Sequence, residues 1–99
     1  MTLVFISGPY RGDIAHNIAI AREHAEKLWQ QGYAVLCPHL NSANMDGTMP
    51  DKTFLDGDLE MLIRCDMVYL LPNWEKSEGS VKEVNIARAW GIPILNDSL

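Results

Sequence analysis

Four short apolar runs alternate with three longer segments of helical periodicity, and this alternation restricts the fold more than any other feature of the chain. The apolar runs occupy residues 3–6, 33–37, 67–71 and 92–95. Their length and their flanking Gly and Pro residues are typical of strands that are buried on both faces of a parallel sheet. The segments between them carry apolar residues three or four positions apart, as amphipathic helices do. These helices are expected at residues 14–31, 51–65 and 81–90.

A regular alternation of strands and helices predicts an α/β fold in three layers, because right-handed crossovers place helices on the faces of a parallel sheet. We expect the strand order 2-1-3-4, as in flavodoxin-like and related Rossmann-like sheets. Pro93 has no amide hydrogen to donate, which favours an edge position for the last strand. The 99 residues fit one domain, spanning 1–99.

Composition and charge exclude several classes of function. The formal net charge of −5 would repel a phosphate backbone, so binding of a nucleic-acid polymer is not expected. No apolar run approaches the roughly 20 residues of a membrane span, and the first residues lack the basic leader and cleavage site of a signal peptide. Cys37 and Cys65 stand far apart, which fits reduced thiols and a cytoplasmic location.

Histidine, cysteine and tryptophan bear on cofactors and partners. The histidines and cysteines show no spacing typical of metal ligands, so neither a metal nor another cofactor is expected. Three tryptophans, Trp29, Trp74 and Trp90, are many for a chain of this length. Because large aromatic side chains are enriched at subunit interfaces, they indicate a homodimer or a higher homo-oligomer.

Two loops, at residues 7–12 and 72–83, follow the first and third predicted strands. Ligands of such sheets bind beyond the carboxyl ends of these strands, where the direction of winding reverses. In the first loop Gly8 permits close approach of a ligand, Tyr10 can stack on a heterocycle, and the planar fork of Arg11 suits a phosphate or carboxylate. An ordinary tight turn with an exposed arginine explains these residues equally well.

The second loop leads into the third predicted helix. Ser77, Gly79 and Ser80 lie at the mouth of this helix, where hydroxyls and unpaired amides suit a phosphate. A plain capping loop has the same composition. Trp74 follows the third strand and is a second candidate for stacking on a heterocycle.

The segment 39–50 is expected to be irregular because turn-forming residues are dense in it. A loop of this length in a small domain is often functional. His39, Asn41 and Asn44 follow the second strand and are candidates for the rim of a site, although each is equally common in turns.

Asp58 and Glu83 are acidic residues on otherwise apolar helix faces. Burying a carboxylate costs free energy unless it has a partner, and acids in such places often have a raised pKa at functional sites. For Asp58 the alternative is a carboxylate at the edge of the apolar stripe that reaches water. Glu83 shares a face with Ile86 and Trp90, but it also fits a capping box with Ser80, in which it would bond the cap amide.

Three patches, in this order along the chain, resemble the nucleoside 2-deoxyribosyltransferase superfamily, which includes 2′-deoxynucleoside 5′-phosphate N-hydrolases. They are residues 5–12, 57–68 and 77–84, the last followed by Ala87. The first resembles the loop that holds the sugar end of the substrate, the second the aspartate helix, and the third the glycine-rich turn with the nucleophilic glutamate. The chain also looks like small phage and bacterial domains of unassigned function grouped near that superfamily.

The resemblance implies cleavage of the N-glycosidic bond of a (deoxy)nucleoside or its 5′-monophosphate, by hydrolysis or by deoxyribosyl transfer. Glu83 would attack the anomeric carbon and form a covalent glycosyl-enzyme, while Asp58 would position the substrate and support protonation of the leaving base. Arg11 and Ser77 match residues that hold the 5′-phosphate in the nucleotide hydrolases, which favours a nucleotide substrate. The implied substrate-binding set is Ser7, Gly8, Tyr10, Arg11, Ser77, Gly79 and Ser80.

The sequence also departs from the family pattern. Val81 and Asn85 stand where members often have glycine, and their bulk is expected to narrow the sugar pocket. A non-catalytic module that holds a nucleotide without cleaving it is therefore the alternative function. A structural protein that has lost its site and an enzyme that cleaves a nicotinamide glycosidic bond are further alternatives. Family sites are often completed by a neighbouring subunit, and the tail 96–99 is a candidate to reach one.

Overall fold

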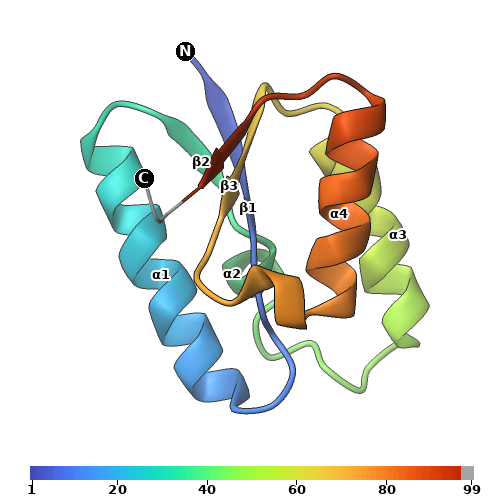
Figure 1. Cartoon of the computed structure of the whole chain (residues 1–99). Coiled ribbons are helices and arrows are strands. Elements are labelled where there is room, and N and C mark those ends of the chain that lie inside the picture. Colours follow the sequence, from blue (N-terminus) through green and yellow to red (C-terminus); the bar gives the residue numbers. More distant parts are fainter. Residues whose placement is uncertain (97–99) are drawn as a thin grey trace.

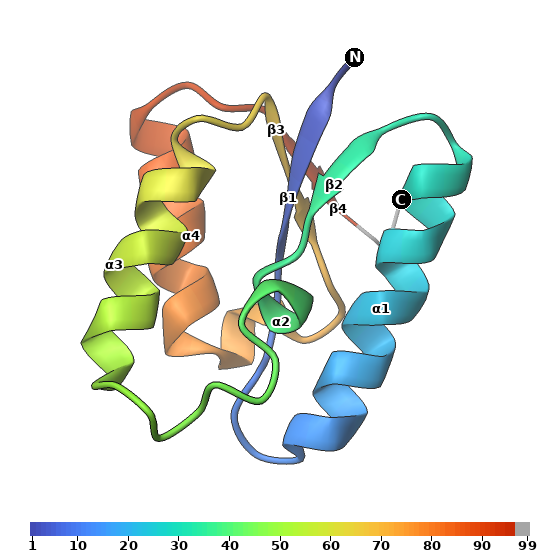
Figure 2. The same cartoon turned by 180° about the vertical axis from the view of Figure 1, so that it is seen from behind.

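The computed structural model describes residues 1–96 and arranges them as helices on both faces of a parallel sheet (Figures 1 and 2). The elements are β1 (Leu3–Ser7), α1 (Ile14–Gln30), β2 (Ala34–Leu36), α2 (Pro38–Asn41), α3 (Asp51–Leu62), β3 (Met67–Leu70), the 3₁₀ helix η1 (Trp74–Lys76), α4 (Glu78–Ala89) and β4 (Ile94–Asn96). The tail residues 97–99, and with them most of the segment considered for a neighbouring site, lie outside the described part of the chain.

The sheet confirms the predicted topology. Within residues 1–96 four parallel strands pair in the order β2-β1-β3-β4. Helix α1 covers one face, and α3 and α4 cover the other (Figure 1). Pro93 precedes the edge strand β4, where its carbonyl accepts from the amide of Val68 at 2.9 Å and its missing amide hydrogen leaves no gap in the ladder.

Two apolar clusters hold the layers together, one on each face of the sheet. Val4 and Ile6 of β1 pack toward α1, against Ala21, Ala25 and Leu28. Phe5, between them, points to the opposite face, as the two-residue period of a strand requires. There it joins a cluster with α3 and α4, whose other buried members are Leu62, Cys65, Val68, Leu70, Val84 and Ala87. The same alternation directs Ser7 toward α3 and α4.

Local signals set the ends of α1. The Asp13 side chain accepts from the amide of His16 at 3.1 Å and caps the helix, as predicted. Gly32 follows the last turn with a φ of 94°, a conformation that costs other residues more than glycine.

Three predicted boundaries were wrong, and the first is the end of α3, which stops at Leu62 rather than at residue 65. The segment 39–50 is not wholly irregular, because α2 forms a single turn that begins at Pro38, and proline is well suited to the first helical position. Helix α4 begins at Glu78 rather than near residue 81, because Ser77 caps it: its side chain accepts from the amide of Ser80.

Candidate active site

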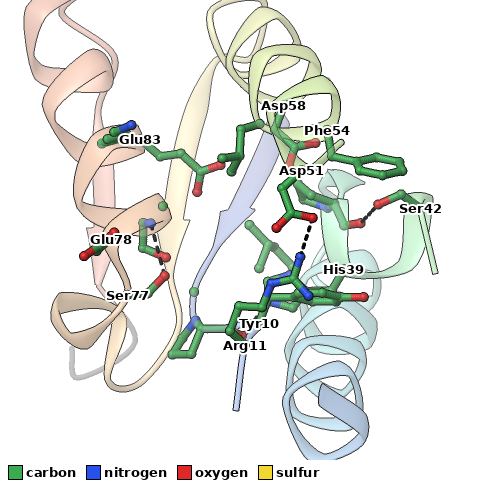
Figure 3. Close-up of a pocket in the computed structure, with 18 of the residues that line it drawn as sticks. Tyr10, Arg11, His39, Ser42, Asp51, Phe54, Asp58, Ser77, Glu78 and Glu83 are labelled. Atoms are coloured by element: carbon green, nitrogen blue, oxygen red, sulfur yellow. Dashed lines mark hydrogen bonds and ion pairs between the residues drawn. The ribbon is translucent and has the colours of Figure 1, made fainter. Parts of the chain in front are cut away.

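A pocket of about 600 Å³ opens beyond the carboxyl ends of the strands (Figure 3). Its walls come from the loop after β1, from α2, from α3 and from the turn into α4. A volume of this size is typical of sites for small molecules. The predicted site residues that line it are Gly8, Tyr10, Arg11, Asp58, Ser77, Gly79, Ser80 and Glu83.

Glu83 extends from the first half of α4 into the pocket (Figure 3). Its neighbour Val84 packs in the core, so the backbone at Glu83 is held close to the sheet. Burial raises the pKa of Glu83 to about 7; the Ser7 hydrogen bond lowers the pKa and the charge of Asp58 raises it. Near neutral pH the side chain therefore exists in both its protonated and its ionised form.

Asp58 reaches the same pocket from α3 (Figure 3). Burial raises the pKa of its carboxyl group to about 6. Asp58 is partly buried and lines the pocket together with Phe54 and Leu55 of the same helix. Two carboxyl groups of raised pKa thus face one cavity from α3 and α4, which is the arrangement required for paired acid and base chemistry.

Ser7 is not on the pocket wall but behind it. It is the last residue of β1, its side chain is 1% exposed, and its hydroxyl donates to Oε1 of Glu83 at 2.6 Å. This contact excludes the capping box that the sequence allowed for Glu83, because the carboxylate is bonded to the sheet and not to the amide of Ser80. The Ser80 amide is bonded by Ser77 instead.

The first turn of α4 forms one end of the pocket. Ser80 is 1% exposed, and its hydroxyl oxygen is buried without a hydrogen-bond partner among the described residues. Because helix amides in the first turn have no partner within the helix, this end combines unpaired donors with a positive dipole end. Gly79 lies beside it, and a Cβ atom there would meet only ordinary contacts, with Leu55 Cδ2 at 3.8 Å and Ser77 Oγ at 3.9 Å.

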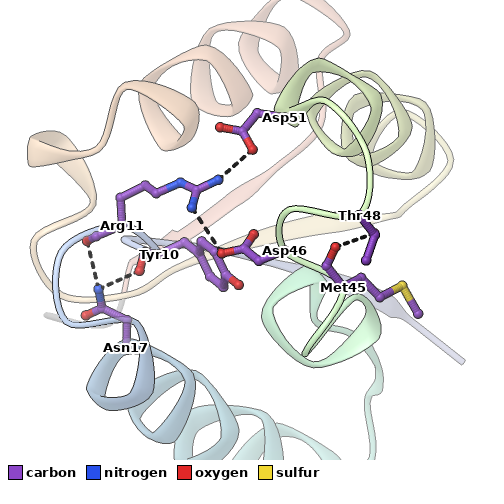
Figure 4. Close-up of polar contacts among 7 residues, drawn as sticks. All are labelled: Tyr10, Arg11, Asn17, Met45, Asp46, Thr48 and Asp51. Carbon is purple, nitrogen blue, oxygen red and sulfur yellow. Dashed lines mark hydrogen bonds and ion pairs between the residues drawn. The ribbon is translucent and has the colours of Figure 1, made fainter.

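Arg11 lines the pocket, and Figure 4 shows its guanidinium paired with two carboxylates. Its guanidinium donates to Asp46 at 3.1 Å and to Asp51 at 2.8 Å, and it lies 5.3 Å from the centre of the Tyr10 ring. Burial and the carboxylate of Asp46 raise the pKa of Tyr10. The side-chain amide of Asn17 donates to the Tyr10 and Arg11 carbonyls, and these hydrogen bonds hold the β1 loop against α1. Sequence reasoning did not find Asp46 or Asp51 as site residues.

Of the three candidates that follow the second strand, His39, Asn41 and Asn44, it is His39 that lines the pocket. It is 6% exposed, lines the pocket, and bonds the Pro9 carbonyl through Nε2 at 2.8 Å. Burial lowers its pKa, so the ring is neutral and the Nε2 proton is the one donated. Its ring also meets Tyr10 edge-on, with centroids 5.8 Å apart. His39 therefore braces the β1 loop from α2.

Other candidates lie elsewhere. Trp74 does not line the pocket and packs against the apolar cluster beneath α4. Asn41 and Asn44 are exposed and do not line it, and Asn44 adopts a φ of 67° typical of a turn. Val81 and Asn85 are exposed on the outer side of α4. The expectation that their bulk narrows the pocket was wrong, because neither side chain lines it.

Metal and membrane features can be stated for residues 1–96. In this range no three His, Cys, Asp or Glu side chains are grouped so that they could hold a metal ion. None of the helices there has the length and apolar character needed to cross a membrane. Cys37 and Cys65 are buried free thiols, and burial raises the pKa of each to about 11, so neither is a reactive thiolate.

Known structures share this fold. A 2-deoxyribosyltransferase from the psychrotolerant bacterium Bacillus psychrosaccharolyticus superposes with a TM-score of 0.73 at 15% identity, over 96% of this chain and 71% of that one. A 2-deoxyribosyltransferase from Leishmania mexicana superposes with a TM-score of 0.69 at 18% identity, over 97% of this chain and 63% of that one. A conserved protein from Enterococcus faecalis V583 superposes with a TM-score of 0.71 at 22% identity, over 97% of this chain and 62% of that one.

The resemblance predicted from the sequence is thus confirmed at the level of the fold, and the chain spans about two thirds of the length of these structures. No curated protein sequence matches it. The model of one family, the domain of unknown function DUF4406, matches residues 2–96, so the chain belongs to the DUF4406 family and has the fold of the 2-deoxyribosyltransferases.

Proposed function

We propose that this protein cleaves the N-glycosidic bond of a (deoxy)nucleoside or its 5′-monophosphate, with Glu83 as nucleophile. The observation that carries the proposal is the pair of partly buried carboxyl groups, Glu83 and Asp58, which line one pocket of about 600 Å³ at the carboxyl ends of the strands. The shared fold of the 2-deoxyribosyltransferases supports the class of substrate. No metal enters the proposed reaction.

The reaction proceeds in two steps. An oxygen of the Glu83 carboxylate attacks the anomeric carbon, the bond from that carbon to the base nitrogen breaks, and the electron pair leaves with the base. Asp58, whose pKa of about 6 keeps part of it protonated, donates a proton to the leaving base. Water or a second base then gives its proton to the Asp58 carboxylate, attacks the anomeric carbon and releases the sugar from the Glu83 carboxylate.

The two ends of the pocket give the substrate its orientation. In the proposal the Tyr10 ring stacks on a planar heterocycle, and Gly8 lets the sugar approach the β1 loop. Ser77, Gly79 and Ser80 line the end of the pocket at which a 5′-phosphate would meet the first turn of α4. Arg11 is the second candidate for that phosphate, but it must first release or share its two carboxylates.

The test is incubation of the protein with a panel of nucleosides and 5′-monophosphates, followed by chromatography for free base. We expect release of base by the wild type and at least about a thousandfold less by Glu83→Gln, which keeps the shape of the side chain and removes its charge. Glu23→Gln, an exposed carboxylate on α1, is the matched control and should keep full activity. Adding a second base in excess separates hydrolysis from transfer.

Two outcomes would contradict the proposal: a wild type inert toward every substrate, or a Glu83→Gln variant that retains activity. If calorimetry then measured tight binding of a nucleotide that is recovered intact, the alternative of a non-catalytic binding module would replace it.

We also infer a cytoplasmic location and self-association. The free thiols of Cys37 and Cys65 fit a reducing compartment. Trp29 and Trp90 are 56% and 62% exposed, and large exposed aromatic side chains are common where subunits meet.

A further inference from the structure

Ser7 occupies one of the most rigidly held positions in the fold. It ends the central strand β1, where it is in register with Leu70 of β3, and its carbonyl accepts from the amide of Leu71 at 2.9 Å. Its side chain is 1% exposed and lies on the face of the sheet covered by α3 and α4. The position of this hydroxyl is therefore set by the sheet, and only a nearby side chain of the covering helices can be its hydrogen-bond partner.

The partner of this hydroxyl is Oε1 of Glu83, at 2.6 Å. The distance is short even for a hydroxyl that donates to a charged oxygen. Glu83 lines the pocket and Ser7 does not, so the serine contacts the carboxylate from the side away from the ligand. A carboxylate has two oxygens, and a bond to Oε1 leaves Oε2 without this contact.

We propose that Ser7 is the positioning residue of Glu83: its hydroxyl holds one carboxylate oxygen against the sheet, fixes the side chain, and presents the other oxygen to the anomeric carbon. This inference rests on the proposed function for its catalytic meaning, but the contact itself can be tested without any substrate.

The same hydroxyl also favours the ionised carboxylate. Burial and the nearby charge of Asp58 both raise the pKa of Glu83, and the hydrogen bond from Ser7 opposes them. A nucleophile must be ionised when it attacks, so a group that favours the charged form enlarges the reactive population at any pH below about 7.

A merely structural role for Ser7 predicts a different result. In that case its hydroxyl would satisfy a buried polar group, and deleting it would change stability without moving the titration of Glu83. The titration of Glu83 is therefore the deciding measurement.

The experiment is a carbon NMR titration of the Glu83 carboxyl group, with the signal assigned by its loss in Glu83→Gln. In Ser7→Ala we expect the pKa to rise by about one pH unit above the wild-type value. Ser80→Ala is the matched control: it removes the hydroxyl of another serine that is 1% exposed, but that oxygen has no hydrogen-bond partner among the described residues. The control should leave the Glu83 titration where it was.

A second pair of variants guards against misfolding of Ser7→Ala. Ser7→Thr and Ser7→Val have side chains of nearly equal size and differ by the hydroxyl, so only the valine should raise the pKa of Glu83. An unchanged titration in Ser7→Ala, or equal titrations in the threonine and valine variants, would overturn the inference.

Turnover gives an independent readout if the proposed function holds. Ser7→Ala should lower kcat about tenfold below neutral pH with little change in KM. It should also move the acidic limb of the pH profile of kcat to higher pH. A wild type without activity would contradict the proposed function. The NMR titration would still test whether the Ser7 hydroxyl bonds the Glu83 carboxylate.

Discussion

The two carboxyl groups of the pocket show how burial changes the pKa of ordinary side chains. Glu83 and Asp58 carry no metal or arginine partner among the described residues, and their pKa values rise to about 7 and about 6 because water is removed from around them. Such burial is unfavourable for folding when the groups are ionised. A site of this kind therefore has a measurable cost in stability.

That cost predicts how stability depends on pH. The pKa of Glu83 is about 7 in the folded chain against 4.5 ordinarily, so the folded state binds the proton more tightly than the unfolded state. The contribution of Glu83 to the free energy of unfolding should therefore fall as pH rises from about 4.5 to about 7, and then level off. The Glu83→Gln variant has no carboxyl group to titrate at this position. Its free energy of unfolding should therefore exceed that of the wild type by roughly 2–3 kcal/mol near pH 8 and should equal it near pH 4.

Urea unfolding at the two pH values is the measurement. Glu23→Gln serves again as the control, because its carboxylate is exposed and should give no gain at either pH. A wild type whose stability rises between pH 5 and pH 8, with Glu83→Gln following it in parallel, would contradict the burial of an acid at this position.

At the scale of elements, sequence reasoning was weakest in the connecting segments between the strands and the long helices. The strands and long helices were predicted because their apolar periodicity is local. The single turn of α2 has no period to detect, and the pairing of Arg11 with Asp46 and Asp51 joins residues at least 35 positions apart. The contact of Ser7 with Glu83 could have been predicted from the sequence, because the alternation of side chains along the strand from Phe5 directs Ser7 toward α4.

The β1 loop offers a test of how tightly its elements fit. Gly8 is required by close packing, because a Cβ atom there would lie 2.5 Å from Leu71 Cβ and 2.6 Å from its Cδ1. Gly8→Ala should therefore lower the free energy of unfolding by about 1–3 kcal/mol. Gly79→Ala, at a position with room for the methyl group, should be neutral or stabilise by up to about 1 kcal/mol.

Thermal or chemical unfolding of the two glycine variants, side by side, decides this prediction. Equal effects of both substitutions would mean that the loop yields easily and that Gly8 is not held against Leu71.

For the whole molecule, the order of strands follows from a chain-wide pattern and was predicted in full. Parallel pairing with helical crossovers leaves few topologies, and the position of Pro93 favoured β4 as an edge strand. The location of the pocket follows from that topology, but its contents depend on side-chain contacts between distant segments. The chemistry therefore stays a proposal while the fold is established.

Self-association is the prediction that belongs to this scale. Trp29 and Trp90 lie at the carboxyl ends of α1 and α4, away from the carboxyl ends of the strands (Figure 1). Sedimentation equilibrium should give at least twice the chain mass of 11.1 kDa, and Trp90→Ser should weaken the association if this end is the contact. A mass of 11.1 kDa at every concentration would refute self-association.

The hydrogen bond between Ser7 and Glu83 joins residues 76 positions apart in the chain. Neither half of the molecule can hold the site alone, because β1 supplies the hydroxyl and α4 the carboxylate. If the proposed reaction takes place, its activity can return during refolding only after α4 has docked on the sheet, however early β1 and β2 pair. The rate at which activity recovers would therefore report the docking of α4, whereas circular dichroism would report the formation of helix.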